Sequence, residues 1–256
     1  MDKQRILILG GTAEARELAG RLAQRGDLEV TLSLAGRTLD PAPQPVPVRT
    51  GGFGGVQGLA GYLADNRIDL LIDATHPFAR QISANAERAA ERTATAMIRL
   101  QRAGWRPVAG DRWTPVASLP DAVAALGAEP RRVFLAIGRQ EAHHFNAAPQ
   151  HAYLVRSVDP LDPPLTVPEV DYVLARGPFV EADEVALLRD HRIDVVVSKN
   201  SGGAATYAKI AAARTLGLPV IMVERTGSGH VPTAQTIDEA LALIGHVASG
   251  GRKRGV

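Results

Sequence analysis

Short apolar runs alternate with longer amphipathic stretches in the first half of the chain. The runs predict strands at Ile6–Leu9, Val30–Ala35, Val46–Arg49, Leu70–Ala74 and Ala96–Leu100. The stretches between them predict helices near Ala13–Gln24, Val56–Asn66 and Arg80–Thr93. Strands that alternate with helices are joined by right-handed crossovers into parallel sheets that are covered on both faces. This half of the chain therefore predicts an α/β domain.

The second half repeats the alternation. Its strands are expected at Val133–Ile137, Tyr153–Val155, Tyr172–Leu174, Val195–Ser198 and Val220–Val223. Its helices are expected near Leu119–Leu126, Arg139–Phe145, Glu181–Asp190, Gly203–Leu216 and Ile237–Ala248. Two tryptophans and three prolines interrupt the pattern between Arg102 and Pro120. We expect two doubly wound parallel-sheet α/β domains, residues 1–110 and 111–256, that face a cleft; one continuous sheet is the alternative.

The first predicted strand runs directly into a glycine turn. Gly10 and Gly11 permit a tight turn and a close approach of the backbone to a ligand. Thr12 suits the N-cap of the helix that follows, whose free amide groups favour a phosphate. The spacing departs from the dinucleotide fingerprint Gly-x-Gly-x-x-Gly, so an ordinary strand–helix turn is the alternative. We assign Gly10, Gly11, Thr12 and Glu14 to a cofactor site.

The end of the second predicted strand bears on the choice of cofactor. A site for NAD usually has an acidic residue there, which holds the ribose hydroxyls. No Asp or Glu lies between Val30 and Leu39, whereas Ser33 and Arg37 are present. A hydroxyl and a planar guanidinium suit a 2′-phosphate. These residues favour NADPH over NADH, although Arg37 could also be a solvated loop arginine.

A glycine-rich loop follows the third predicted strand. Four glycines surround Phe53 between Gly51 and Gly55. Ligands of parallel sheets bind beyond the carboxyl ends of the strands, and a loop with few side chains lets a ligand lie against the backbone. We therefore add Gly52 and Phe53 to the cofactor site; a flexible surface loop is the alternative.

His76 follows the fourth predicted strand. Its side chain titrates near neutral pH, so it could donate a proton or bind a carboxylate. Pro77 is expected to open the next helix at its first position, and Asp73 is expected to brace the turn. A lone histidine is more often structural than catalytic, but this one stands at the carboxyl end of a strand.

Cations follow nearly every predicted strand of the second half. They are Arg139, Arg156, Arg176, Lys199 and Arg225. Single cations at such positions are usually solvated or paired, but five at one sheet edge would form a positive rim for a ligand with several carboxylates or phosphates. Asn200, Ser201 and Gly202 follow Lys199 and are expected to open a helix that favours an anion.

Composition sets the remaining limits. The 256 residues include no cysteine, which excludes disulfides and thiolate metal sites, and we expect no metal site. A net charge of +2 does not favour a nucleic-acid partner. No apolar run is long enough for a membrane span. The first strand begins almost at once, which leaves no room for a signal peptide, so a cytoplasmic protein is expected.

Seven motifs together resemble the precorrin-6A reductase family. They are Gly-Gly-Thr-x-Glu-Ala from Gly10, Ser-Leu-Ala-Gly-Arg from Ser33, Gly-Gly-Phe-Gly-Gly from Gly51, Asp-Ala-Thr-His-Pro-Phe-Ala from Asp73, Ile-Gly-Arg-Gln-Glu from Ile137, Leu-Ala-Arg-Gly-Pro-Phe from Leu174 and Val-Ser-Lys-Asn-Ser-Gly-Gly from Val197. The resemblance implies two Rossmann-like domains and an oxidoreductase that uses NADPH to reduce one ring double bond of the tetrapyrrole precorrin-6A. The product would be precorrin-6B, in vitamin B12 (cobalamin) biosynthesis.

The resemblance leaves several points open. Related enzymes use cobalt-precorrin-6A and NADH; an NADP-dependent reductase of another polyanion and a non-catalytic binding protein are further alternatives. We expect Arg139, Arg156, Arg176, Lys199, Asn200, Ser201 and Gly202 to bind the carboxylates of the macrocycle. His76 and Lys199 are candidate proton donors, and water is a third. Neighbouring enzymes of the cobalamin pathway are possible partners.

Overall fold

The computed structural model describes residues 3–36, 43–225 and 231–251, the side chains of 247–251 aside. The chain divides into two compact units, and the first combines residues 1–102 with 228–256. The second unit comprises residues 103–227. The first boundary lies close to the expected one at residue 110. The expectation that the whole C-terminal half forms the second domain is wrong, because the last segment joins the first unit.

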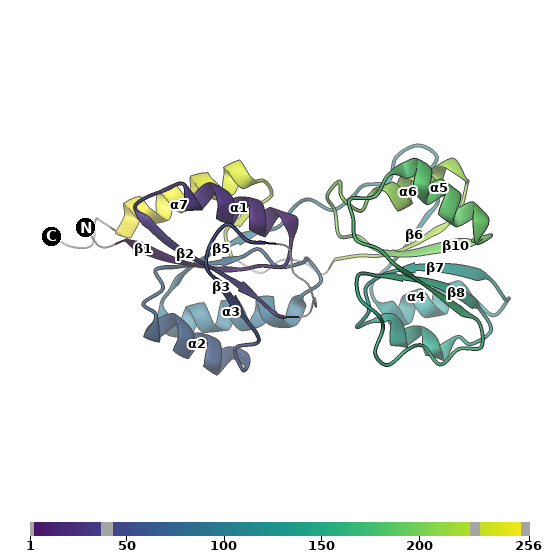
Figure 1. Ribbon diagram of the computed structural model, residues 1–256, viewed down its shortest axis with the longest axis horizontal. Coiled ribbons are helices and arrows are strands. Elements are labelled where there is room, and N and C mark those ends of the chain that lie inside the picture. Colours follow the sequence, from purple (N-terminus) through teal and green to yellow (C-terminus); the bar gives the residue numbers. More distant parts are fainter. Residues whose placement is uncertain (1–2, 37–42, 226–230, 252–256) are drawn as a thin grey trace. The chain divides into compact units, whose positions relative to one another are not determined.

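The first unit is a six-stranded parallel sheet in the order β12-β5-β4-β1-β2-β3. Its strands are β1 (Gln4–Leu9), β2 (Leu28–Leu34), β3 (Val48–Thr50), β4 (Leu70–Asp73), β5 (Ala96–Leu100) and β12 (Thr233–Ala234). Its helices are α1 (Ala13–Ala23), α2 (Gly55–Asp65), α3 (Arg80–Thr93) and α7 (Ile237–Gly251). Helices α1 and α7 cover one face of the sheet, and α2 and α3 cover the other (Figure 1).

The position of strand β1 between two helical layers explains why every residue from Ile6 to Leu9 is apolar. Ile6 and Ile8 pack in the core beneath α1 and α7, whereas Leu7 and Leu9 pack in the core beneath α2 and α3. All four residues are buried, as a strand between two helical layers requires.

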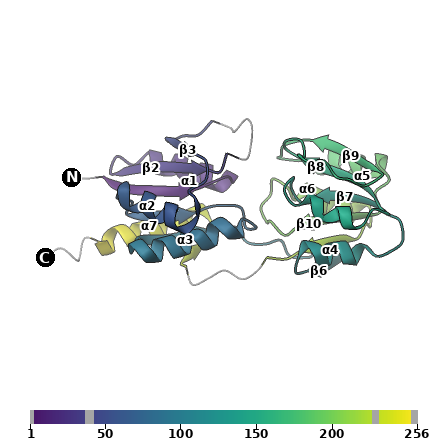
Figure 2. The ribbon, with the colours of Figure 1, turned by 90° about the horizontal axis from the view of Figure 1, so that it is seen from below.

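The second unit has the same architecture, with the strand order β6-β11-β10-β7-β8-β9 and only parallel pairs. Its strands are β6 (Trp113–Val116), β7 (Arg132–Ala136), β8 (Ala152–Ser157), β9 (Val170–Leu174), β10 (Val195–Lys199) and β11 (Val220–Val223). Its helices are α4 (Leu119–Leu126), α5 (Glu181–Asp190), α6 (Ala208–Thr215) and the 3₁₀ helix η1 (Ala142–Ala147). Figure 2 shows β3 and β9, each at the outer edge of its sheet.

Two parallel sheets flanked by helices confirm the doubly wound α/β prediction, and the alternative of one continuous sheet is wrong. Three local predictions also differ. Strand β6 lies in the stretch that interrupts the pattern, the helix expected at Arg139–Phe145 is the short η1, and α6 begins at Ala208 instead of Gly203. Within the described residues, none of the helices is long and apolar enough to cross a membrane.

Each sheet reverses its winding direction at one place. In the first unit the chain proceeds from β1 to β2 and β3 on one side, and then to β4 and β5 on the other. The reversal therefore lies between β1 and β4. In the second unit the corresponding reversal lies between β7 and β10. Ligands of open α/β sheets bind beyond the carboxyl ends of the strands at such switch points, so the functional residues are sought there.

Candidate active site

The glycine turn occupies the switch point of the first unit. The Thr12 hydroxyl accepts a hydrogen bond from the amide of Ala15 (3.1 Å), which confirms Thr12 as the N-cap of α1. The same hydroxyl donates to the carbonyl oxygen of Ala74 after β4 (2.9 Å), so it ties the two sides of the switch point together. Gly11 has a φ of +116°, and no described atom lies within 4 Å of the place where its Cβ would be. The turn thus leaves open space at the start of a helix, where an anionic group is stabilised.

Glu14 forms an ion pair in this structure. Its carboxylate accepts a hydrogen bond from the guanidinium of Arg102, at 2.6 Å, and both side chains are partly exposed. Arg102 follows β5, which lies on the far side of β4 from β1. The pair holds the first turn of α1 against the end of β5, so Glu14 has a structural partner in addition to its predicted place near a cofactor.

Ser33 lies at the carboxyl end of β2, directly beside the glycine turn. Its carbonyl oxygen accepts from the amide of Gly10 at 2.9 Å, and its side chain is buried. On its other side, Ser33 pairs in register with Arg49 of β3. Arg37, which we predicted to act with Ser33, lies outside the described residues. Arg49 was not singled out by the sequence, although it immediately precedes the glycine-rich loop.

The backbone of the glycine-rich loop after β3 adopts conformations that favour glycine. Gly51, Gly54 and Gly55 have φ values of +110°, +79° and +83°, which side chains rarely adopt. A Cβ on Gly58 of α2 would lie 1.7 Å from the carbonyl oxygen of Phe53, so the helix and the loop touch backbone to backbone. Gly52 is exposed and Phe53 is half-buried. The glycine conformations and this backbone contact therefore define the conformation of the loop.

His76 lies beyond the end of β4, on the other side of the switch point from the loop. Its Nδ1 accepts from the amide of Phe78 at 3.3 Å, which puts the proton of a neutral ring on Nε2. The prediction that Pro77 opens α3 is wrong. It lies in a turn closed by the amide of Ala79 and the carbonyl of His76 (2.7 Å), and α3 begins at Arg80.

Asp73 braces this segment, as the sequence indicates. Its Oδ1 accepts from the amide and the hydroxyl of Thr75, at 3.2 and 2.7 Å. Its Oδ2 accepts from Arg99 at 3.1 Å, and Arg99 also binds Glu87 at 2.6 Å. Asp73 and Arg99 are both buried. Burial of Arg99 opposes its charge, but the bonds to Glu87 and Asp73 outweigh this and raise its pKa. The turn before His76 is thus anchored to the core.

Lys199 and Glu141 form an ion pair at the switch point of the second unit. Lys199 ends β10, and Glu141 follows β7, the strand beside it. Glu141 was not predicted as a site residue, although it ends the Ile-Gly-Arg-Gln-Glu motif. Arg139 belongs to the same loop and is half-buried, whereas Arg176 follows β9 and is exposed. These side chains give the carboxyl edge of the second sheet a group of charges.

Arg156 does not belong to an exposed cationic rim, so this prediction is wrong. Its side chain is buried and forms an ion pair with the equally buried Glu184 of α5. The guanidinium carbon lies 3.7 Å from the centre of the Phe179 ring and 5.0 Å from that of Phe134. A charge enclosed in this way is neutralised inside the protein, and the side chain holds α5 against β8.

The Asn200–Gly202 segment does not open a helix. Asn200 is buried; its side chain accepts from the amide of Trp105 (2.7 Å) and donates to the Trp105 carbonyl and to Glu224. A Cβ on Gly202 would lie 2.0 Å from the carbonyl oxygen of Ala103. Ser201 is also buried, and Arg225 donates to the Asn200 carbonyl at 2.6 Å. These contacts show a packed segment that joins the start and the end of the second unit.

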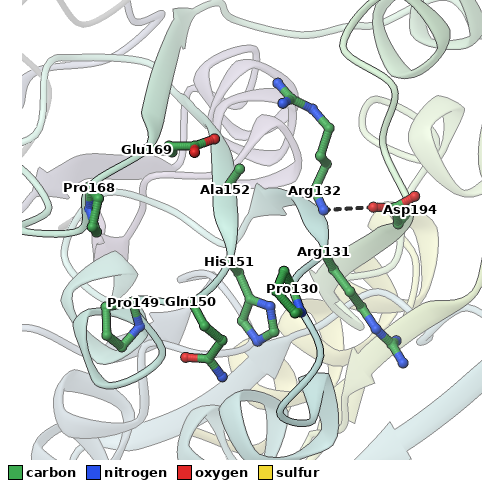
Figure 3. A pocket seen from close by; sticks show the side chains of 10 residues that line it. All are labelled: Pro130, Arg131, Arg132, Pro149, Gln150, His151, Ala152, Pro168, Glu169 and Asp194. Carbon is green, nitrogen blue, oxygen red and sulfur yellow. Dashed lines mark hydrogen bonds between the residues drawn. The ribbon is translucent and has the colours of Figure 1, made fainter.

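A hollow of about 400 Å³ lies at the opposite, amino-terminal end of the strands of the second sheet (Figure 3). His151 lines it and is buried, and neither ring nitrogen has a hydrogen-bond partner among the described residues. Burial lowers the pKa of His151; the charge of Arg131 adds to this effect and the Gly127 carbonyl opposes it. The hollow lies away from the switch point, so we do not include it in the candidate active site.

No group of three or more potential metal ligands occurs among the described residues.

Comparison with known proteins gives one consistent family. A family model described as "Precorrin-6x reductase CbiJ/CobK" matches residues 5–245. A precorrin-6A reductase from a Sinorhizobium species is 62% identical and covers 96% of this chain and 94% of its own length. One from Rhodobacter capsulatus is 50% identical, covering 98% and 99%. Three relatives named cobalt-precorrin-6A reductase are less similar, between 27% and 30% identical.

A solved structure leads to the same family. The structure described as "CobK precorrin-6A reductase" is 49% identical, has a TM-score of 0.91, and covers 95% of this chain and 97% of its own. The resemblance in the motifs, the match of the family model and the likeness in structure agree over almost the full chain. This chain therefore belongs to the precorrin-6x reductase family, CbiJ/CobK.

Proposed function

We propose that this chain reduces one ring double bond of precorrin-6A with NADPH and gives precorrin-6B, a step in vitamin B12 biosynthesis. Its membership of the reductase family supports the reaction. The observation that supports the cofactor most strongly is the turn at Gly10–Thr12, where an open, glycine-lined space meets the capped start of α1 at the switch point of the first sheet.

The residues of the first unit fit a phosphorylated dinucleotide. The amide groups at the start of α1 would hold the pyrophosphate beside Gly10, Gly11 and Thr12. Ser33 and the predicted Arg37 would hold the adenosine side, and the backbone of Gly52 and the ring of Phe53 would lie along the bound molecule. When bound there, NADPH supplies a hydride to the substrate. Glu14 would act through its ion pair with Arg102, which fixes the first turn of α1.

The second unit would hold the acidic macrocycle. Arg139 and Arg176 lie at the carboxyl edge of its sheet and can pair with substrate carboxylates. Lys199 reaches the same edge but is paired with Glu141, so a substrate carboxylate would share or replace this partner. Arg156, Asn200, Ser201 and Gly202 are packed inside the unit, and we assign them to the support of this edge and not to direct contact.

A proton must reach the substrate after the hydride. His76 and Lys199 are the proposed donors, because each lies at a switch point and carries a hydrogen on nitrogen; water is the third source. His76 would present Nε2–H, since its Nδ1 accepts from the amide of Phe78. The same Nε2–H could instead orient a carboxylate of the macrocycle. We favour this orienting role, because the surrounding turn fixes the ring in place.

Reduction of cobalt-precorrin-6A with NADH is the alternative. The lower identity to relatives of that name favours the metal-free substrate, and Ser33 without a nearby acidic residue at the end of β2 favours NADPH.

The proposal is tested by measuring oxidation of the reduced cofactor, which is monitored through the decrease in the absorbance of the cofactor. The chain is incubated with precorrin-6A or cobalt-precorrin-6A, each with NADPH or NADH. We expect the highest kcat/KM with precorrin-6A and NADPH. Preferred turnover of cobalt-precorrin-6A with NADH would support the alternative, and the absence of turnover with all four pairs would contradict both.

A further inference from the structure

Arg49 stands at the end of a line of three neighbouring strand ends. The glycine turn follows β1, Ser33 lies near the end of β2, and Arg49 pairs with Ser33 from β3, an outer strand of the sheet. Neighbouring parallel strands lie about 4.8 Å apart. A dinucleotide whose pyrophosphate lies at the first strand end and whose adenosine ribose lies at the second would bring its ribose 2′ position toward the third.

The Arg49 guanidinium is held firmly in place. Its Nη1 donates to the carbonyl oxygen of Gly51 at 2.5 Å, and its Nη2 donates to that of Gly52 at 2.7 Å. Its Cζ lies 3.7 Å from the centre of the Phe53 ring. A guanidinium fixed by two carbonyls and an aromatic ring loses little conformational entropy when an anion binds to it.

Within the part of the chain that the structure describes, Arg49 forms no ion pair with a carboxylate. Among the described residues, no Asp or Glu oxygen lies within 4.0 Å of its guanidinium, whereas Arg99 and Arg102 of the same unit each form ion pairs. Its side chain is half-buried. A half-buried cation without a counter-charge favours the binding of an anion from outside the protein.

One contact of Arg49 is weak and marks where that anion would bind. Nη1 lies 3.4 Å from the Ser33 hydroxyl oxygen, which is long for a hydrogen bond. The second hydrogen of Nη1 and the Ser33 hydroxyl can both donate to one oxygen placed between them. A phosphate oxygen there would exchange a weak contact for two charge-assisted hydrogen bonds.

We propose that Arg49, together with Ser33, binds the 2′-phosphate of NADPH and determines the preference for NADPH over NADH. The inference rests on the proposed function, because it presupposes a nicotinamide cofactor at the glycine turn. It adds a specificity residue that the sequence did not indicate, and it gives the glycine-rich loop a role. The loop carbonyls of Gly51 and Gly52 position the guanidinium that would bind the 2′-phosphate.

The test compares two ligands that differ only in the 2′-phosphate. Binding of adenosine 2′,5′-bisphosphate and of AMP is measured by calorimetry for the full chain and for Arg49→Met, which keeps an apolar stem against Phe53. We expect the unaltered chain to prefer the bisphosphate. Arg49→Met should reduce this preference at least about tenfold, because it removes charge-assisted bonds to the phosphate. Retained AMP binding shows that the variant is folded and that the glycine turn is intact.

Arg92→Met is the matched control. Arg92 lies in the last turn of α3, which runs back to the amino-terminal edge of the sheet, opposite to Arg49. The control should keep the full preference. Equal loss of both ligands in Arg49→Met, or an unchanged preference, would overturn the inference and give Arg49 only the role of holding the loop.

Turnover separates this inference from the proposed function. If the unaltered chain reduces precorrin-6A with NADPH, Arg49→Met should raise KM for NADPH about tenfold or more and leave that for NADH within about twofold. Turnover with an unchanged KM ratio would overturn the inference alone. An unaltered chain that turns over with neither cofactor would overturn the proposed function and, with it, the inference.

Discussion

Single charged residues of this protein differ mainly in whether another part of the chain neutralises them. Arg156 is enclosed with Glu184 and stacked on Phe179, so its charge stabilises the interior. Lys199 is paired with Glu141 but stays at the sheet edge, where the proposed substrate would compete for it through a carboxylate. Among the described residues, the Arg49 guanidinium contacts two carbonyl oxygens, the Ser33 hydroxyl and aromatic rings, and forms no ion pair. The three cations thus differ in role: Arg156 stabilises the fold, Lys199 is proposed to contact the substrate, and Arg49 is proposed to bind an anion.

The buried pair of Arg156 and Glu184 should contribute to folding and not to substrate binding. Glu184→Leu leaves a buried, unpaired guanidinium and should lower the free energy of unfolding by about 3–5 kcal/mol. The double variant Arg156→Met/Glu184→Leu should recover most of the loss. Both tryptophans, Trp105 and Trp113, lie in the second unit, so their fluorescence in urea reports its unfolding. A stable Glu184→Leu variant that binds the substrate weakly would contradict this assignment.

His76 should affect the substrate more than the cofactor. His76→Ala removes the proposed hydrogen bond to a substrate carboxylate and should raise KM for precorrin-6A about tenfold, with kcat changed only a few-fold. Steady-state kinetics at saturating NADPH separates the two constants. A fall in kcat of about 100-fold would instead identify His76 as the proton donor. Unaltered values of both constants would remove it from the site.

The sequence could not reveal these pairings, although it indicated the cation of each pair. Arg156 and Glu184 are 28 positions apart, and Lys199 and Glu141 are 58 apart, so only the folded sheet brings each pair together. By contrast, Thr12 as a helix cap and Asp73 as a brace are local features, and both predictions are confirmed. These two local features were predictable from the sequence, and the long-range charge compensation was not.

At the scale of elements, the glycine-rich loop and helix α2 form one rigid piece. Three loop glycines adopt positive φ, and Gly58 of α2 lets the carbonyl of Phe53 lie against the helix backbone. The same loop presents the carbonyls that hold Arg49. A change on the helix should therefore reach the proposed cofactor site through the loop.

Gly58→Ala tests this connection. A Cβ 1.7 Å from the Phe53 carbonyl oxygen forces the loop or the helix to move, so NADPH affinity should fall at least about tenfold. Gly61→Ala, on the same helix, has nothing within 4 Å of its Cβ and should keep full affinity. It should also raise stability by up to about 1 kcal/mol, since alanine favours helix over glycine. Undiminished NADPH binding by Gly58→Ala would show that the loop does not transmit the change.

Elements with strong apolar runs were predicted well, and the misses have physical causes. Helices α4 and α5 have the predicted bounds. Strand β6 was missed because Trp113–Val116 contains a proline, which an edge strand tolerates but a central strand does not. Strand β12 has two residues, too few for a periodic signal. Helix α6 begins late because Asn200 and Gly202 hold the preceding segment against Ala103 and Trp105.

At the scale of the whole molecule, the first unit is built from both ends of the chain. Strand β12 pairs with β5, and α7 places Ala240 and Ile244, both fully buried, in the core that also contains α1. The proposed cofactor site thus depends on a segment more than 200 residues away from Gly10 in sequence. The second unit is continuous in sequence and does not use this segment.

A shortened chain tests this division. A chain that ends at Arg225 loses β12 and α7 and exposes the apolar face beneath them, so the first unit should no longer bind NADPH. Tryptophan fluorescence should still report a cooperative unfolding of the second unit. A chain that ends at Gly251 keeps α7 and serves as the control, with unchanged binding. NADPH binding by the chain that ends at Arg225 would show that the first unit folds without its last strand and helix.

The central claim is that this protein transfers a hydride from NADPH to a ring carbon of precorrin-6A. In the most direct measurement, precorrin-6A is reduced with NADPH whose transferable hydrogen has been replaced by deuterium. The tetrapyrrole product is then analysed by mass spectrometry. The account predicts a reduced tetrapyrrole that contains this deuterium, together with one hydrogen from the solvent. A reduced product without the label, or oxidation of NADPH without a reduced tetrapyrrole, would contradict it.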